Sequence, residues 1–218
     1  MQEEKKKDSK IKNKYYRAFL DGGFIRTIEI DDIISAFENI NGKYEKQHKT
    51  FLSAIYYSGA RPNEVLNLVS ENVKKIGNYV HITLPPSKSG LPRTIIINIK
   101  KPLIKEFYKY CLSMPPNTYL FFSLRNKYLR TKVNKNRVSR DYIEITGKLG
   151  YYFKKWFGFL DDPISPYYLR HNRFSKLSMK GASTSDIRML KGSKTDSSVF
   201  PYLHMSQAKA KKIEKMMD

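Results

Sequence analysis

The stretch Ser58-Gly-Ala-Arg-Pro-Asn-Glu-Val-Leu-Asn-Leu68, written SGARPNEVLNL, contains signals for the end of one helix and the start of another. Gly59 suits the left-handed backbone position that follows many helices. Pro62 suits the first turn of the next helix, where a backbone N–H is not needed. The apolar residues of 65–68 then supply a buried side. The stretch therefore predicts two helices that meet at a short bend, with the cation Arg61 in the bend.

Outside this stretch, hydrophobic periodicity predicts a mainly α fold with one small antiparallel β-sheet, an α+β class. Ile30, Ile33, Ile34 and Phe37 share one face of a predicted helix, so we expect all four to face the core. The other predicted elements include a helix from about 44 to 57 and two strands at 78–84 and 93–99, joined by a hairpin loop at 85–92. Four further helices are predicted: one starts at Pro102, two cover 139–157 and 167–180, and one begins after a Ser183–Asp186 capping box.

The composition limits the class of partner more than it limits the fold. The 218 residues carry a net charge of +21, with a pI near 9.8, which favours nucleic acid first and an anionic membrane surface second. No apolar run reaches the ~18 residues of a membrane span, and the N-terminus lacks the apolar core of a signal peptide. We therefore expect an intracellular protein of the cytoplasm or nucleoid with no membrane partner. The single cysteine, Cys111, and four scattered histidines predict no disulfide, no metal site and no cofactor.

Several residues could carry chemistry, although each has an ordinary structural explanation. A guanidinium at a helix start, such as Arg61, can share a phosphate with free backbone N–H groups, and Glu64 can fix its direction. The same spacing more often makes only a local ion pair. Arg170, inside an amphipathic helix, must either extend its head to water or meet an anion. Lys88 in the hairpin loop and Tyr202 before the basic tail are more often a solvated lysine and a packed tyrosine.

Basic residues are concentrated in one segment and at both ends. Residues 125–140 include seven basic and no acidic side chains, which makes them a solvated loop or a DNA-facing loop. The net charge favours DNA. We expect residues 1–26 to form a basic tail or linker and residues 206–218 a basic helical tail. The predicted DNA-binding residues are Arg93, Arg125, Lys127, Arg130, Lys132, Lys135, Arg137, His171 and Lys194.

Four segments, in this order, resemble the boxes of the tyrosine recombinase (integrase) family. YYSGARPNEVLNL (56–68) resembles the T-G-x-R-x-x-E box, and SKSGLPRTIII (87–97) resembles the hairpin that carries a catalytic lysine. SPYYLRHNRFSKL (165–177) is similar to the P-H-x-L-R-H-T-F box, and LKGSKTDSSVFPYLH (190–204) to the L-G-H segment before a nucleophilic tyrosine. The resemblance covers about residues 27–205 and is nearest to the divergent integrases of archaeal viruses and plasmids.

The resemblance implies the fold of a tyrosine recombinase catalytic domain over residues 27–205, working without a metal or cofactor. It implies that Arg61 and Arg170 bind the scissile phosphate and that Lys88 protonates the leaving 5′ oxygen. Tyr202 would be the nucleophile.

Two positions depart from the family pattern. Tyr167 stands where the H-x-x-R box has its histidine. Ser193 stands where the L-G-H segment has its histidine, unless a shift of one residue brings in Lys194. The family histidines help to bind the phosphate and to handle protons, so these departures predict a slower reaction.

The resemblance also implies partners. We expect double-stranded DNA and a homotetramer at synapsis, formed from a monomer or weak oligomer in solution. Family members usually carry a core-binding domain before the catalytic one. With about 27 residues ahead of the first box-bearing helices, either the chain is a catalytic fragment or the basic tail replaces that domain. The alternatives are a catalytically impaired DNA-binding protein of the same fold, a type IB topoisomerase-like activity, and an RNA-binding protein.

Overall fold

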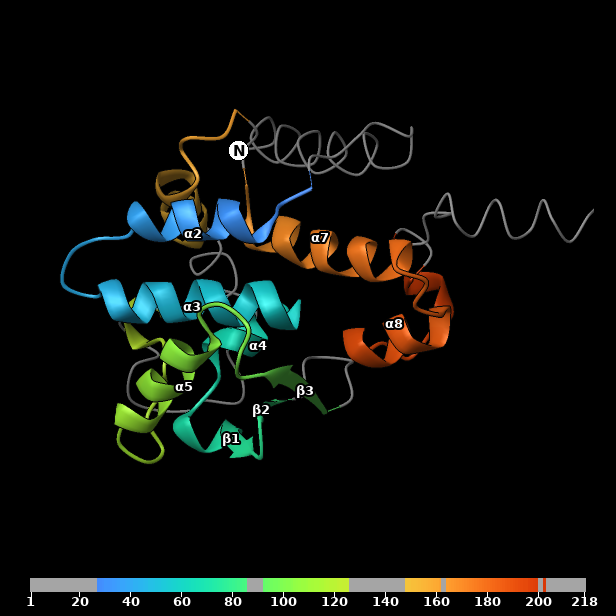
Figure 1. The fold of residues 1–218 in the computed structure, drawn as a ribbon, viewed down its shortest axis with the longest axis horizontal. Coiled ribbons are helices and arrows are strands. Elements are labelled where there is room, and N and C mark those ends of the chain that lie inside the picture. Colours follow the sequence, from blue (N-terminus) through green and yellow to red (C-terminus); the bar gives the residue numbers. More distant parts are fainter. Residues whose placement is uncertain (1–26, 86–91, 126–147, 162–163, 200–201, 203–218) are drawn as a thin grey trace, which may run out of the picture.

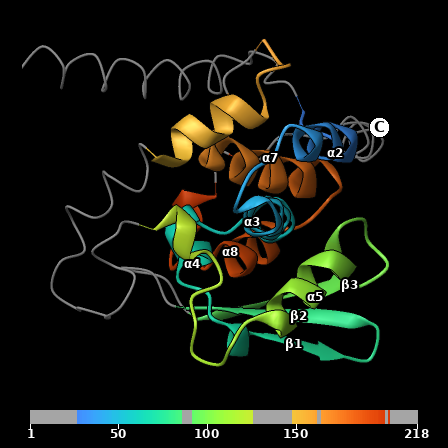
Figure 2. The same cartoon turned by 90° about the vertical axis from the view of Figure 1, so that its left-hand side faces the viewer.

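The computed structural model of the chain describes residues 27–85, 92–125, 148–161, 164–199 and 202. Helix α3, Glu45–Ser58, lies at the centre of the fold (Figure 1). Figure 2 shows α3 nearly end-on, with helices above it and the sheet below it. Phe51, Leu52 and Ile55 on α3 are fully buried. Burial of each such side chain contributes about 1.5–3 kcal/mol to stability, so α3 anchors both layers.

Four further helices lie near α3, and three of them contact it directly. Helix α2, Ile30–Glu38, and helix α7, Pro166–Met179, form the layer above it, and α7 packs directly against α3. Helix α4, Pro62–Leu66, follows the bend after α3. Helix α8, Thr184–Lys191, packs against α7 and against the last strand of the sheet.

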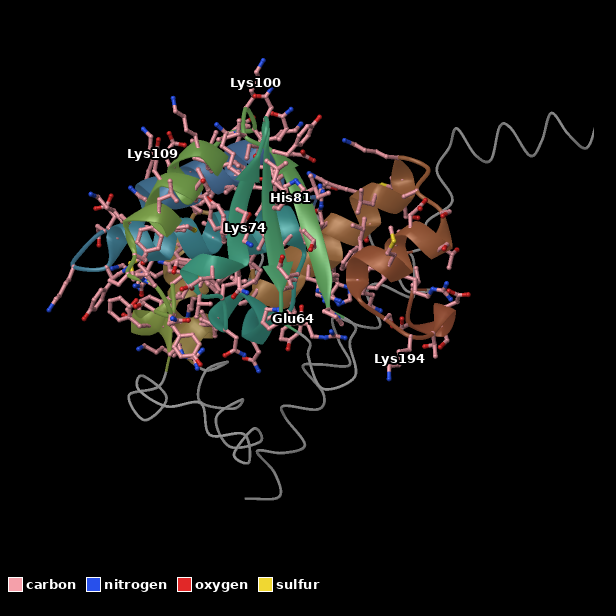
Figure 3. The ribbon with its side chains drawn as sticks, turned by 90° about the horizontal axis from the view of Figure 1, so that it is seen from below. Glu64, Lys74, His81, Lys100, Lys109 and Lys194 are labelled. Atoms are coloured by element: carbon pink, nitrogen blue, oxygen red, sulfur yellow. The ribbon has the colours of Figure 1, made fainter. Side chains whose placement is uncertain are left out.

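The sheet has three antiparallel strands in the order β1-β2-β3. They are β1, Val73–Ile76, β2, Tyr79–Leu84, and β3, Arg93–Asn98, and β1 follows the short helix η1, Ser70–Asn72. Burial alternates along β2 and β3, as expected when one face of a sheet packs on a core. The opposite face carries polar groups, among them the exposed Lys74 and the partly exposed His81 (Figure 3). Arg93 lies on the buried side of β3.

The remaining elements complete the core. Helix α5, Ile104–Ser113, packs against α3 and β1, and the short helix η2, Phe122–Leu124, follows it. Residues 148–156 are helical and bury Phe153 and Trp156. Phe121 meets Phe51 edge-on, with ring centres 5.3 Å apart, an arrangement that aromatic pairs prefer. The last described segment contains the single-turn helix η4, Asp196–Ser198.

The fold confirms the predicted α+β class, with local differences. Ile33 is fully buried and Ile30 and Phe37 pack partly buried against the core, as predicted, whereas Ile34 is 39% exposed, so its predicted burial was wrong. The inward face of α2 continues through Ala36 rather than through Ile34. Strand β1 was not predicted, since VKKI shows one buried residue followed by three exposed ones. Among the described residues, none of the helices has the length and hydropathy needed to cross a bilayer.

Candidate active site

The bend between α3 and α4 places Arg61 at the edge of the candidate site. Gly59 has a left-handed backbone, with φ 58°, and its N–H donates to the Ile55 carbonyl as α3 ends. A Cβ at position 59 would lie 2.9 Å from the Arg173 Cγ. Position 59 therefore requires glycine both for its backbone conformation and for the close approach of α7.

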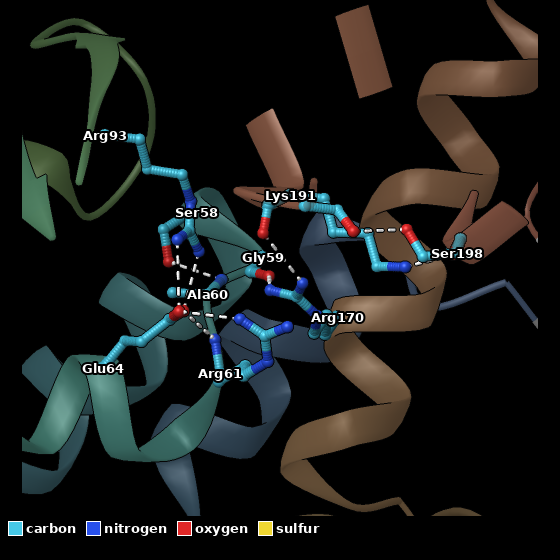
Figure 4. A network of polar contacts seen from close by, with 10 residues as sticks. Ser58, Gly59, Ala60, Arg61, Glu64, Arg93, Arg170, Lys191 and Ser198 are labelled. Carbon is cyan, nitrogen blue, oxygen red and sulfur yellow. Dashed lines mark hydrogen bonds and ion pairs between the residues drawn. The ribbon is translucent and has the colours of Figure 1, made fainter. Parts of the chain in front are cut away.

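Glu64 holds two arginines from one buried position (Figure 4). Its carboxylate accepts the Arg61 backbone N–H at 2.7 Å and the Arg61 Nη1 at 3.0 Å. Arg93 donates its Nη1 and Nη2 to the same carboxylate at 3.1 and 2.7 Å. Burial raises the pKa of Glu64, but the hydrogen bonds and charge of Arg93 and the Arg61 N–H together bring that pKa below its usual value. We call Arg61, Glu64 and Arg93 the carboxylate-held cluster.

Arg170 is held instead by main-chain carbonyls. Its Nη1 donates to the Gly59 carbonyl at 2.5 Å and its Nη2 to the Lys191 carbonyl at 3.2 Å. The residue is 3% exposed. Burial lowers the pKa of the Arg170 guanidinium to about 10, and the nearby cation Arg61 adds to the shift. The group remains charged at neutral pH.

Tyr202 lies near Arg170 and packs on the Phe174 ring, over which the Arg170 guanidinium also lies. It is 5% exposed, and its ring centre lies 4.9 Å from that of His171 and 5.4 Å from that of Phe174. The Lys191 Nζ lies 4.9 Å from the centre of the same ring. The charge of Tyr202 raises the pKa of Arg170, as expected of a close acid–cation pair. We call Arg170, Lys191 and Tyr202 the carbonyl-held cluster.

His171 occupies a different place from the DNA contact that the sequence predicted. Burial lowers the pKa of His171 to about 4, with smaller contributions from the charges of Arg170 and Lys191. The imidazole is therefore neutral at pH 7 and packs on Tyr202. The reason is that α7 turns this side toward α8 and the segment that carries Tyr202.

Lys191 is a member of this site that sequence reasoning missed. It is the last residue of α8 and is 8% exposed. Its Nζ donates a hydrogen bond to the Ser198 carbonyl. The available signal was spacing: Lys191 follows the fully buried Ile187 by four residues, so the two share the inward face of α8.

The residues at the two histidine positions lie near the same site. Tyr167 is partly buried in the first turn of α7, one helical turn before Arg170. Ser193 is also partly buried, with its Oγ 2.5 Å from the Ser198 Oγ. Lys194, the other candidate for that position, is exposed and points outward (Figure 3).

Two predicted DNA contacts belong to the interior of the protein. Arg93 is 9% exposed and committed to Glu64, as described above. Arg125 is 6% exposed, donates Nη1 to the Leu66 carbonyl and the Asn67 Oδ1 at 2.7 Å each, and lies over the Tyr119 ring. Both predictions of a DNA-facing side chain were wrong, because local charge does not reveal that a guanidinium has internal acceptors.

The remaining predicted site residues fall outside the described part of the chain. They are Lys88, Lys127, Arg130, Lys132, Lys135 and Arg137. The predicted tails at 1–26 and 206–218 fall outside it as well.

The described site combines a phenol with an excess of positive charge. Arg61 and Arg93 contact the carboxylate of Glu64, while Arg170 and Lys191 lie on the other side of the Gly59 carbonyl and bind main-chain carbonyls (Figure 4). The side chain of Arg61 is 30% exposed, so it can reach a ligand while still paired with Glu64. Within the described residues, His, Cys, Asp and Glu form no group of three that could hold a metal ion. The arrangement suits an anion next to a nucleophilic oxygen.

Solved structures with a similar fold include recombinases and an integrase. XerA recombinase superposes with a TM-score of 0.57 at 17% identity, covering 89% of this chain and 65% of the other. XerH recombinase bound to its difH substrate gives 0.60 at 16% identity, covering 87% and 52%. The Tn1549 transposon integrase in complex with circular intermediate DNA gives 0.56 at 13% identity, covering 88% and 67%.

Sequence comparison reaches the same group. A tyrosine recombinase of Thermosipho africanus (strain TCF52B) is 23% identical over 187 residues, which is 84% of this chain and 57% of the relative. The chain thus spans a little over half the length of that recombinase. The model of the phage integrase family matches residues 24–209. The chain therefore belongs to the phage integrase family, that of the tyrosine recombinases.

Proposed function

We propose that the chain is a site-specific DNA recombinase or integrase that cuts and rejoins strands through a 3′-phosphotyrosyl intermediate. The observation that carries this proposal is the packing of Tyr202 beside Arg170 and Lys191 in one chain. Attack on a phosphodiester requires a nucleophilic oxygen and fixed positive charge where the transition state becomes more negative. Membership in the family supports the same reaction.

In the proposed cleavage step, the Tyr202 Oη attacks the scissile phosphorus. A P–Oη bond forms and the bond from phosphorus to the 5′ oxygen breaks. The phenol loses one proton and the 5′ oxygen gains one, so the step consumes no oxidant, reductant or nucleotide. We assign the protonation of the leaving 5′ oxygen to Lys88 on the resemblance alone. Arg61 and Arg170 would bind the phosphoryl oxygens.

The cations also reduce the cost of ionising the nucleophile. A phenol with a pKa near 10 is ionised in roughly one molecule in a thousand at pH 7, which corresponds to ~4 kcal/mol. A guanidinium and an ammonium in a water-poor site offset part of this cost. Religation runs the same step in reverse, since the energy of the broken bond stays in the phosphotyrosyl link.

Hydroxyl groups take the places of the two family histidines in this proposal. Tyr167 and Ser193 can donate hydrogen bonds to a phosphate, but they do not exchange protons near neutral pH as an imidazole does. We therefore expect slow strand cleavage. The likeness to the divergent integrases of archaeal viruses and plasmids remains a prediction.

Double-stranded DNA is the proposed substrate, and the net charge of +21 supports it. The XerH and Tn1549 proteins were solved with DNA, which adds support by analogy. We propose a homotetramer at synapsis, a monomer or weak oligomer before it, and an intracellular place of action. Lys127, Arg130, Lys132, Lys135, Arg137 and Lys194 stay predicted DNA contacts.

A nicked duplex that carries the attachment site of the element encoding this chain tests the proposal. Cleavage next to the nick releases a short fragment and traps the covalent intermediate. We expect a protein–DNA band on a denaturing gel that disappears in Tyr202→Phe. Tight duplex binding without any band would instead favour the catalytically impaired alternative.

A further inference from the structure

We propose that Lys191 is the positioning residue of the nucleophile: its ammonium group holds the Tyr202 segment in place and stabilises the charge that forms on the phenol oxygen. This inference rests on the proposed function and deepens it. Sequence reasoning gave Lys191 no role, and the four boxes assign it none.

The contacts of Lys191 connect three parts of the site. Its Nζ donates to the carbonyl of Ser198, four residues before Tyr202, and lies 4.9 Å from the centre of the Tyr202 ring. Its own carbonyl accepts the Arg170 Nη2 at 3.2 Å. One residue therefore fixes the segment that carries the nucleophile and also a guanidinium expected to bind the phosphate.

The charge of Lys191 is not neutralised by an acidic partner. Among the described residues, its ammonium forms no ion pair with a carboxylate. Burying an ammonium without such a partner is costly unless an anion arrives. The phenolate of Tyr202 and a bound phosphate are the anions that the proposed reaction brings there.

Burial lowers the pKa of Lys191 to about 8, and the positive charges of Arg170 and Arg61 lower it further in the same direction. The Lys191 side chain is thus mostly protonated at pH 7 and loses its positive charge as the pH rises through about 8. The charged or titratable groups that lie toward it are Arg170 and His171 on α7, Arg61 before α4, Arg93 on β3 and Tyr202. The acidic group of η4, Asp196, is paired with Arg188 instead.

A purely structural role would require only a hydrogen-bond donor to Ser198. Three variants separate this from a role of charge. Lys191→Met removes the donor and the charge, Lys191→Gln keeps an amide donor without charge, and Lys191→Arg keeps a charge that does not titrate below pH 12. Lys180→Met makes the same change of charge at an exposed lysine at the end of α7 and serves as the matched control.

The first readout is the single-turnover rate of covalent adduct formation on the nicked duplex. At pH 7 we expect losses of about 10²-fold in Lys191→Met and Lys191→Gln, less than about tenfold in Lys191→Arg, and none in the control. DNA binding should change by less than about threefold in all four. At subsaturating DNA, the wild-type rate should fall above pH 8 while the rate of Lys191→Arg continues to rise. Wild-type rates in Lys191→Gln, or equal losses in Lys191→Gln and Lys191→Arg, would overturn the proposal.

The second readout does not need cleavage. With ¹³Cζ-labelled tyrosine, the resonance missing from Tyr202→Phe identifies Tyr202, and its titration can be followed in the free protein. We expect Tyr202 to ionise at a lower pH in Lys191→Arg than in Lys191→Met, because only the arginine places a positive charge beside the phenol over the pH range in which the tyrosine titrates. Equal midpoints would refute the electrostatic contact. If the wild type forms no adduct but the midpoints differ, the proposed function fails while the assignment of Lys191 stands.

Discussion

The carboxylate-held cluster and the carbonyl-held cluster fix an arginine in two different ways. Arg61 shares the Glu64 carboxylate with Arg93, so much of its charge is already balanced. Arg170 is bound only by the carbonyls of Gly59 and Lys191 among its described hydrogen bonds. A carbonyl orients a guanidinium without neutralising it. The first cluster thus favours stability and the second retains more positive charge for an anion.

The largest effect on adduct formation is expected at Arg170, whose positive charge is bound by carbonyls rather than by a carboxylate in its described hydrogen bonds. Arg170→Lys keeps one positive charge, but an ammonium cannot replace the planar fork that reaches two carbonyls. We expect adduct formation to fall about 10³-fold, and the loss of a carbonyl partner to lower stability by about 1–3 kcal/mol. Single-turnover cleavage and denaturant unfolding measure these effects. Arg188→Lys on α8, an exposed arginine paired with Asp196, is the control. Wild-type cleavage in Arg170→Lys would remove the distinction between the clusters.

Removing the carboxylate tests the stability side of the comparison. Glu64→Gln leaves the buried Arg93, and the partly exposed Arg61 beside it, without their anion, so we expect a loss of about 3–5 kcal/mol in the free energy of unfolding. Glu45→Gln breaks a partly exposed i,i+4 pair with Lys49 and should cost less than about 0.5 kcal/mol. Urea denaturation of both variants compares them directly. Similar small losses would show that the cluster contributes little to stability.

Acid should weaken both clusters, through different groups. The pKa of His171 is about 4 in the folded protein and near 6.5 when unfolded, so its contribution is complete above pH 6.5 and is lost as the pH falls toward 4. Glu64, with a lowered pKa, loses its contribution only below its unfolded value, near 4.5. His171→Phe keeps a ring on Tyr202 and should remove about 2 kcal/mol of the stability change between pH 7 and 4. Thermal melts at several pH values test this, and an unchanged pH profile would contradict it.

The smallest effect concerns the contact between the two clusters. A Cβ at position 192 would lie 2.5 Å from the Arg93 Nη1, and Gly192 has φ +66°. Gly77 has a similar φ of +56° with nothing within 4 Å, so it isolates the backbone strain. We expect Gly77→Ala to cost about 1 kcal/mol and Gly192→Ala about 1 kcal/mol more, with slower cleavage only in the latter. Equal losses would show that the clusters are not coupled at this point.

The sequence predicted features that depend on local interactions. The end of α3 at Gly59, the start of α4 at Pro62 and the Ser183–Asp186 capping box were all confirmed, since each depends on residues within one turn. The order of the four family boxes along the sequence identified Arg61, Arg170 and Tyr202 as candidate site residues. The burial of Arg93 and Arg125 could not be predicted, because their acceptors lie 29 and 59 residues away in sequence. Lys191 was missed because a lysine in the last turn of a helix ordinarily lies in solvent beside the helix C-terminus, and its four-residue spacing from Ile187 was the signal that it faces inward.

The hydrogen bond from Arg170 to the Gly59 carbonyl joins residues that are 111 positions apart. During translation, Gly59 leaves the ribosome before α7 and α8 have been synthesised. A chain whose synthesis stops before α7 therefore lacks Arg170, the second carbonyl that orients it, and Tyr202. In the proposed reaction, such a partial site would hold the Arg61 cation without the nucleophile. Because Arg170, Lys191 and Tyr202 follow Arg61 in the chain, the proposed nucleophile joins the site only after its first cation has been synthesised.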